Sequence, residues 1–360
     1  MFTLPRFCEP DFGKEPFLSA PDAAVMPAGD GYLPEDFYAT TIFPEYVKIC
    51  GRWIMVEDSR MDSCVVINGG IPRAVEPRKI KKGDMVVVGR ADDGRSGVYV
   101  HSKAFEQEKE TDDSSVFAFR TGKSRESSYS EDYDKLYSIL RNDKERGNIV
   151  WVLGPACVFD YDSRNAMARL IDKGYCHALF AGNALATHDL EAAIFNTGLG
   201  QDIYTKKLMT NGHYNHLHTI NLVREQGSIQ AFLKKYKVGS GVMSSLVRNG
   251  IPYVLAGSIR DDGPLPEVIS DVYEAQNAMR ELTKKATVVI ALATQLHTIA
   301  TGNMTPSFVK VKGVVRPVYF YSVDISEFAV NKLRDRGSLS VTGIVTNIQD
   351  FLVNMERNLD

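Results

Sequence analysis

The sequence has few cysteines, and they follow no recognisable pattern. Its 360 residues contain five, Cys8, Cys50, Cys64, Cys157 and Cys176, which are widely spread and include no CxxC pair. A disulfide framework normally has an even number of cysteines, and a thiolate zinc site normally has them in close pairs. We therefore expect reduced thiols and neither kind of site.

Long apolar runs and an excess of one charge are also lacking. No stretch approaches the roughly 18 apolar residues of a membrane span, and residues 1–17 lack the basic segment and apolar core of a secretory signal. The net charge is −3 without a long lysine or arginine run, so nothing indicates binding to nucleic acid or anionic lipid. We expect a soluble, cytoplasmic protein with small-molecule partners, and neither a nucleic-acid nor a membrane partner.

The remaining composition is that of a globular protein large enough for two domains, with 44% hydrophobic and 24% charged residues. Residues 1–32 carry five prolines and little periodicity, which predicts an irregular arm on the surface. Short β-rich runs between Gly, Asp and Pro turns predict a small β-rich domain over residues 33–130. Its charged, serine-rich end would lead into a second domain over residues 131–360.

From Ile149 onward, apolar strands alternate with amphipathic helices, which predicts a Rossmann-like α/β domain with a parallel sheet. Strands are expected at 149–153, 176–182, 251–257, 287–294 and 318–324, and helices near 163–173, 185–195, 217–236, 266–285 and 326–336. Several strands end in a small residue followed by polar groups. Because open α/β sheets bind ligands at the carboxyl ends of their strands, we expect a nucleotide-sized cleft there.

The stretch IPYVLAGSIRDDGPLP at residues 251–266 is the strongest candidate for the chemistry. Arg260 follows a strand end and can clamp a carboxylate through two hydrogen bonds. Asp261 or Asp262 can accept a proton and stabilise positive charge in a closed cleft. An equal alternative is a polar loop whose aspartates merely cap a helix that starts near Pro266.

A dinucleotide site needs backbone amides near its phosphates and a carboxylate for a ribose. The familiar GxGxxG is missing after the first strand, where the sequence reads GPACVF, but residues 197–200 and 301–303 offer glycine-containing turns. Asp324 ends a strand and can bind a ribose, although helix capping explains it equally well. The candidate cofactor residues are Gly154, Pro155, Ala156, Gly182, Asn183, Thr197, Gly198, Gly200, Asp202, Gly257, Ser258, Thr294, His297, Gly302, Asn303 and Asp324.

Three histidines in the stretch GHYNHLH, namely His213, His216 and His218, raise the question of a metal site. No cysteine and no acidic third ligand lies at ordinary spacing, and hydrogen-bonded histidines at a helix start explain the pattern as well. We therefore expect no metal. Nearby, His188 and Asp189 can either orient each other or cap a helix.

Several motifs along the chain carry a family resemblance. They are LPEDFYATT at 33–41, GDMVVVG at 83–89, GPA at 154–156, LFAGNALATHDLE at 179–191, TGLGQDIY at 197–204, GSIRDDGPLPEVISDV at 257–272, ATQLHTIATGNM at 293–304 and DRGS at 335–338. From about Leu33 to Leu352 the chain resembles the archaeal-type ornithine cyclodeaminases and the second half of cyanobacterial arginine-degrading fusion enzymes. The same segment is known as the lysine-ketoglutarate reductase/saccharopine dehydrogenase associated domain.

The resemblance implies an NAD-binding domain of the deoxyhypusine-synthase-like type, a small β domain that helps close the substrate pocket, and a homo-oligomer. It also implies a redox-neutral reaction. Bound NAD⁺ takes hydride from the α-carbon of ornithine, the δ-amine attacks the imine, ammonia leaves, and NADH reduces the cyclic imine to proline. In this scheme Asn183, Asp202 and His297 would orient substrate or nicotinamide.

The side expected to meet substrate departs from the family. The segment after the double threonine reads TTIFPEYVK rather than TTNxPTxVR, so Ile42 stands in place of asparagine, and an additional KGVVRPVYF stretch precedes Ser322. If Ile42, Phe43 and Arg120 line the pocket, a related amino acid with a modified or longer side chain would be preferred over ornithine. A relative that stops after oxidation or condenses the imine with another partner, and a non-catalytic NAD-binding protein, are the alternatives.

Overall fold

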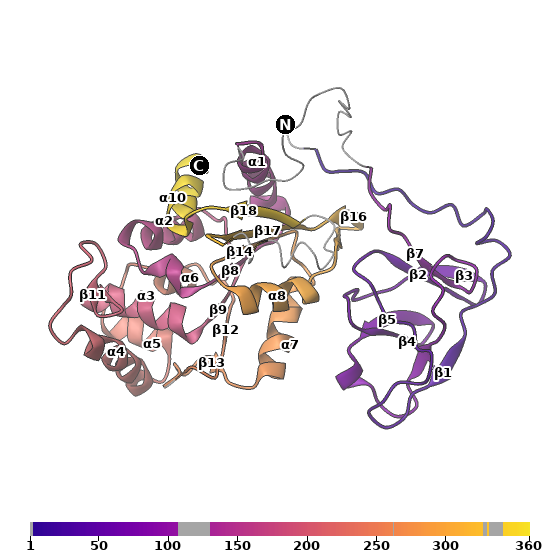
Figure 1. Cartoon of the computed structure of the whole chain (residues 1–360), viewed down its shortest axis with the longest axis horizontal. Coiled ribbons are helices and arrows are strands. Elements are labelled where there is room, and N and C mark those ends of the chain that lie inside the picture. Colours follow the sequence, from indigo (N-terminus) through magenta and orange to yellow (C-terminus); the bar gives the residue numbers. More distant parts are fainter. Residues whose placement is uncertain (1–2, 107–129, 262, 327–329, 331–340) are drawn as a thin grey trace.

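The computed structural model describes residues 3–106, 130–261, 263–326, 330 and 341–360. Two parts are visible in Figure 1, an amino-terminal part made of short strands and a larger part in which helices cover a sheet. The predicted combination of a β-rich region with a Rossmann-like α/β domain is thus confirmed. Helix α1 (Ser130–Arg146) is the first described element after residue 106, and it belongs to the larger part.

The amino-terminal part contains two small antiparallel sheets. One has the order β1 (Val25–Pro27), β6 (Met85–Val87), β4 (Cys64–Asn68), β5 (Ile71–Val75), and the other β3 (Arg52–Met55), β2 (Glu45–Ile49), β7 (Val98–Val100). Val47, Val65 and Val87 form the fully buried centre of a core that both sheets share. A short 3₁₀-helix, η1 (Pro77–Lys79), follows β5.

The proline-rich residues 3–32 are packed against these sheets. Strand β1 lies within this segment and pairs with β6. The ring of Phe12 stacks on that of Trp53, with centroids 5.1 Å apart and planes 10° from parallel. The Lys48 ammonium donates to the carbonyl oxygens of Phe17, Leu18 and Ala20 at 2.6–3.2 Å. These contacts fix a segment whose sequence pattern indicated only an irregular arm.

The larger part is built on a seven-stranded parallel sheet. Its order is β13 (Val268–Ile269), β12 (Tyr253–Ala256), β9 (Ala178–Gly182), β8 (Ile149–Leu153), β14 (Val288–Leu292), β17 (Tyr319–Asp324), β18 (Val341–Val345). Apart from the short β13, this is the doubly wound order 3-2-1-4-5-6, in which the direction of winding reverses between the first and fourth strands. That switch point lies between β8 and β14.

Helices bury both faces of this sheet. Ile149, Trp151 and Leu153 of β8 point into one core, and Val150 and Val152 point into the other. On the first face lie α1, η2 (Pro155–Val158), α2 (Tyr161–Asp172), α3 (Asn183–Phe195), α6 (Val242–Arg248) and α10 (Ile348–Asn358); on the second lie α7 (Val272–Thr283) and α8 (Gln295–Met304). A strand covered on both faces has no polar side, which explains the nearly unbroken apolar runs in the sequence.

Two expected helices have different limits in the structure. The helix expected over 217–236 is two helices, α4 (Gly212–Gln226) and α5 (Ile229–Lys235), because Gly227 adopts a left-handed conformation and the Ser228 side chain caps α5. The helix expected from residue 266 begins only at Val272, where the Asp271 carboxylate accepts two backbone N–H groups. Residues 268–269 instead pair with β12.

Three further expectations concern short segments. Residues 301–303 form no turn, since they lie in the last part of α8. The turn at 197–200 does form, between β10 (Thr197–Gly198) and β11 (Gln201–Asp202), with positive φ at Leu199 and Gly200. The additional KGVVRPVYF stretch contributes to a hairpin of β15 (Phe308–Val311) and β16 (Val314–Pro317). Most of the helix expected near 326–336 lies outside the described residues.

The two parts of the molecule are joined at α7 and α8. The guanidinium of Arg280 in α7 is 4% exposed and donates to the carbonyl oxygens of Asp58 and Ser59 in the amino-terminal part. Ser307, just after α8, donates its N–H and its hydroxyl to the carbonyl oxygen of Ile42. Main-chain carbonyls of the small part are therefore held by side chains and backbone of the large one.

The first prediction concerns Glu45, a fully buried carboxyl group in β2. Burial raises its pKa to about 7, although hydrogen bonds from Thr41 N and Tyr38 Oη lower it. The folded state thus holds a proton that the unfolded chain releases, and the free energy of unfolding falls as pH rises from about 4.5 to about 7. Glu45→Gln should remove this dependence and stabilise the protein by on the order of 3 kcal/mol at about pH 8.

Urea unfolding of both proteins, at about pH 5 and about pH 8, measures the effect. Glu57→Gln is the matched control, because Glu57 is exposed and pairs with exposed Arg73. An unchanged pH slope in Glu45→Gln would contradict the assignment.

The second prediction concerns the close approach of strand ends at the switch point. A Cβ atom on Gly154 would lie only 2.0 Å from the carbonyl oxygen of Ala293. Gly154→Ala should therefore push β8 and β14 apart and cost at least about 1–3 kcal/mol in the free energy of unfolding. In Gly182→Ala the added Cβ would meet His297 Cε1 at an ordinary 3.5 Å. Equal unfolding temperatures for the two variants would refute the prediction.

Candidate active site

The carboxyl edge of the parallel sheet gathers most of the candidate residues from separate parts of the chain. They are Gly154, Pro155 and Ala156 after β8, Gly182 and Asn183 at the end of β9, Gly257, Ser258, Arg260 and Asp261 after β12, Thr294 and His297 after β14, and Asp324 at the end of β17. Parallel strands bring these ends to one side of the sheet, which is where open α/β folds bind ligands.

The loop after β12 is a tight polar turn. Asp261 closes it, because its carboxylate accepts the Ser258 N–H at 2.9 Å and its own N–H donates to the Ser258 carbonyl oxygen. The Ser258 hydroxyl accepts the Arg260 N–H. Between them Ile259 is completely exposed, and so is much of the Arg260 side chain. The turn presents Arg260 to solvent and holds Asp261 in place, while Asp262 lies outside the described residues.

Asn183 connects this loop to the neighbouring strand end. The residue is buried, and its Oδ1 accepts the N–H of Leu265 at 3.0 Å and the hydroxyl of Thr187 at 3.3 Å. Its position at the start of α3, directly after β9, follows from the strand ending at Gly182. Asn183 therefore fixes where the 257–265 loop sits at the sheet edge.

His297 lies opposite this loop in the first turn of α8. Its ring borders Gly182, at an ordinary contact distance of 3.5 Å from the position that a Cβ on Gly182 would take. Burial lowers the pKa of His297, and the nearby negative charge of Asp261 only partly opposes that effect. An imidazole that is kept neutral in this way can accept a proton from a ligand.

A cavity of about 660 Å³ opens beside the loop that follows β8. Residues from the start of α2, from the length of α10 and from the 198–206 segment line it. They are Phe159, Asp160, Asp162, Gly198, Leu199, Gln201, Asp202, Lys206, Asn347, Gln349, Asp350, Val353 and Arg357. Gln349 donates to the Ala156 carbonyl oxygen, which ties the cavity to the sheet edge. Its volume is within the range of small-molecule sites.

Sequence reasoning missed most of this lining. Asn347 could have been predicted from the sequence, because it stands between the last strand and the last helix and caps that helix. Lys206 could not have been predicted, since only the folded structure brings its ammonium group to 2.8 Å from the Phe159 carbonyl oxygen. Asp202 was a candidate, but its carboxylate accepts the N–H groups of Tyr204 and Thr205 and stabilises its own turn.

The other candidates for cofactor binding, Thr294, Asp324, Gly302 and Asn303, do not line a large cavity among those described. Thr294 and Asp324 border a hollow of about 10 Å³ between β14 and β17, room for about one water molecule. The Asp324 carboxylate accepts the N–H of Ser326, as a capping residue does. Gly302 is buried within α8, and Asn303 beside it is partly buried, so neither belongs to an open phosphate-binding turn.

The proposed substrate-facing residues lie where the two parts meet. Ile42 is 5% exposed, and its carbonyl oxygen is bound by Ser307. Phe43 is half-buried beside it, while Arg120 lies outside the described residues.

Asp189 caps α6 through the N–H groups of residues 242 and 243 and forms a buried ion pair with Arg164.

Within the described part of the chain, no helix combines the length and apolarity needed to cross a membrane.

Comparison with known proteins gives a consistent relationship over almost the whole chain. The family model described as "Arginine dihydrolase ArgZ-like, C-terminal, Rossmann fold" matches residues 135–355, and the corresponding "first region" matches 44–130. Ornithine cyclodeaminase of Methanocaldococcus jannaschii is 42% identical over 340 residues, covering 92% of this chain and 76% of that protein. The bifunctional arginine dihydrolase/ornithine cyclodeaminase AgrE of Nostoc sp. is 36% identical, covering 94% of this chain and 47% of AgrE.

Solved structures agree with this relationship. A LOR/SDH protein from Methanococcus maripaludis S2 superposes with a TM-score of 0.84 at 36% identity, covering 94% of this chain and 98% of that one. AgrE in ternary complex with ornithine and NAD⁺ superposes with a TM-score of 0.58 at 33% identity, covering 94% and 46%. The chain therefore belongs to the ArgZ-like carboxyl-terminal family, together with the archaeal ornithine cyclodeaminases.

Proposed function

We propose that this protein is an NAD-dependent cyclodeaminase that converts ornithine into proline and ammonia. The observation that carries the proposal is that Arg260 and Asp261 follow β12 and His297 follows β14 at the carboxyl edge of a doubly wound sheet, with the charge of Asp261 near enough to act on the pKa of His297. Relatives that carry the name ornithine cyclodeaminase cover more than nine-tenths of the chain, and AgrE has been crystallised with ornithine and NAD⁺.

The residues of the sheet edge fit a dinucleotide. Gly182 and Gly257 leave the ends of β9 and β12 free of side chains, so a ligand can approach the backbone there, whereas at Gly154 the Ala293 carbonyl oxygen fills the space that a side chain would take. The cavity beside Ala156 offers additional nucleotide-sized space, and Asp324 supplies a carboxylate on the other side of the switch point. Bound NAD would supply a reversible hydride acceptor for the α-carbon of the substrate.

The side chains of the site supply binding and proton transfer. The exposed guanidinium of Arg260 can hold the α-carboxylate of an amino acid through two hydrogen bonds. Asp261 can accept a proton from the substrate ammonium group and stabilise iminium charge, and neutral His297 beside it can carry that proton onward. Asp262 remains a candidate for the same proton transfer.

A second substrate class is favoured by one departure from the family. Ile42 provides no hydrogen-bonding group where asparagine is usual, and a site that lacks a polar partner discriminates against the substrate that needs it. On this basis a related amino acid with a modified or longer side chain would replace ornithine. The reaction type would stay the same.

The third prediction tests both substrate classes in one assay. Purified protein should contain NAD or show a thermal shift with it, and should release ammonia and proline from ornithine without net consumption of NAD. Mass spectrometry after incubation with a panel of diamino acids and diamines identifies the product. Oxidation products without cyclisation would indicate the alternative enzyme class, and absence of both NAD binding and turnover would overturn the oxidoreductase chemistry altogether.

The fourth prediction concerns the proton acceptor. Asp261→Asn keeps a side-chain oxygen for the Ser258 N–H but removes the charge, so kcat should fall on the order of 10²–10⁴-fold. The thermal shift caused by NAD should remain. Asp271→Asn is the matched control, because Asp271 only caps α7 and asparagine caps a helix equally well. Wild-type turnover in Asp261→Asn would assign the aspartate to the turn alone.

A further inference from the structure

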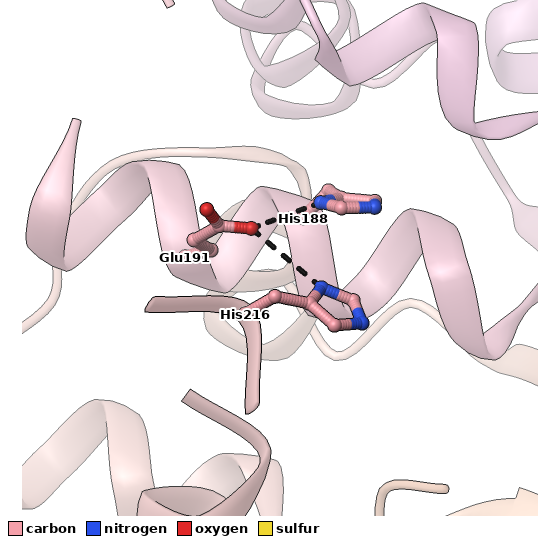
Figure 2. Close-up of side chains that lie close together, drawn as sticks. All are labelled: His188, Glu191 and His216. Atoms are coloured by element: carbon pink, nitrogen blue, oxygen red, sulfur yellow. Dashed lines mark hydrogen bonds and ion pairs between the residues drawn. The ribbon is translucent and has the colours of Figure 1, made fainter. Parts of the chain in front are cut away.

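A carboxylate and two imidazoles from α3 and α4 meet next to Thr197 of the β10–β11 hairpin. Figure 2 shows a nitrogen of His188 and a nitrogen of His216 directed at the same oxygen of Glu191. The Nδ1 atoms of His188 and His216 lie 2.9 Å and 3.6 Å from Glu191 Oε2. The three residues offer one potential ligand atom each, all within 4.8 Å of one another. His188 and Glu191 come from α3 and His216 from α4.

The charge of Glu191 is not balanced by a permanent cation. The side chain is fully buried, and within the part of the chain that the structure describes it is paired with histidines and with neither lysine nor arginine. Burial opposes ionisation, but the neighbouring side chains of His188, His216 and Thr197 outweigh it and lower the pKa of Glu191. A buried carboxylate needs a compensating positive charge, which only a protonated histidine or a bound cation can supply here.

The position of His216 favours a bound cation. Its Nδ1 is buried and has no hydrogen-bond partner, because 3.6 Å from Glu191 Oε2 is too long for a hydrogen bond. Ligand atoms around a tetrahedral Zn²⁺ ion are roughly 3.3–3.5 Å apart, since each lies about 2.0–2.2 Å from the metal. The distances of 2.9 and 3.6 Å fall on either side of that spacing.

We propose that His188, Glu191 and His216 form a binding site for one divalent transition-metal ion of the Zn²⁺ class. Two imidazoles and one carboxylate suit such ions better than Mg²⁺ or Ca²⁺, which prefer oxygen ligands. Three protein ligands leave a fourth tetrahedral position for water.

The neighbours of the cluster connect it to the large cavity. The hydroxyl of Thr197 donates to Glu191 Oε1 at 2.8 Å and accepts from Asn215 Nδ2 at 3.0 Å, so it orients the carboxylate from the hairpin side. The ring of Phe159, which lines the cavity, packs edge-on against His188 with centroids 4.9 Å apart. A metal ion would therefore cross-link α3 and α4 and brace the hairpin that borders the cavity.

The fifth prediction tests the site without any assay of turnover. Full-length protein, freed of metal with a chelator, is titrated with Co²⁺ and followed by its visible absorption, and Zn²⁺ is then added as competitor. We expect one ion per chain, displaced by Zn²⁺. His216→Ala should weaken Zn²⁺ binding by more than about 100-fold, and Thr197→Val by about 10–100-fold, the usual cost of losing a group that orients a ligand.

His213→Ala is the matched control, because His213 is an exposed histidine on the same helix, and it should bind as tightly as the wild type. Glu191→Gln should lose binding like His216→Ala. If the buried Glu191 variant does not fold, His216→Ala decides alone, since its side chain is 32% exposed. Failure of the wild type to bind either ion, or equal binding by wild type and His216→Ala, would overturn the proposal and leave a histidine proton as the counter-charge of Glu191.

Discussion

Burial of the central sheet on both faces is the constraint on which the rest of the structure depends. The side chains of β8 and β14 are all buried, so these strands have no solvated face on which to place a polar group. Chemistry is therefore confined to the residues just beyond each strand. The glycines there follow from the same constraint, since Gly154 must pass against the Ala293 carbonyl oxygen where the two strands end together.

This constraint is also why so much of the fold could be predicted. The expected strands at 149–153 and 287–294 correspond to β8 and β14, because a strand buried on both faces leaves a continuous apolar run. Helix starts were less predictable. Pro266 suits the first turn of a helix, but residues 268–269 pair with β12 instead. The helix therefore begins only after Asp271, which caps it. Pairing with a strand that is distant in the sequence therefore outweighed the local preference for a helix start at Pro266.

In the candidate site, too, some residues could be predicted from the sequence and others could not. Residues that directly follow a strand, such as Asn183 and Asp261, could be found from the sequence because chain direction alone places them at the sheet edge. Glu191 could not be connected with His216, since they are 25 positions apart on separate helices and the contact depends on how α3 packs against α4. Lys206 belongs to the same class, because its partner carbonyl at Phe159 comes from another loop.

The joint between the two parts has a consequence for sequence divergence. Arg280 binds the main-chain oxygens of Asp58 and Ser59, and Ser307 binds that of Ile42. Every residue type offers the same carbonyl oxygen, so these hydrogen bonds do not depend on the side chains at positions 42, 58 and 59, although Ile42 and Ser59 are themselves buried. Position 280 has no such freedom, since a guanidinium is needed to reach carbonyls on both sides. The hydrogen bonds that attach the small part to the large one therefore place a sequence requirement on the large part, at Arg280, and none on the side chains whose carbonyl oxygens are bound.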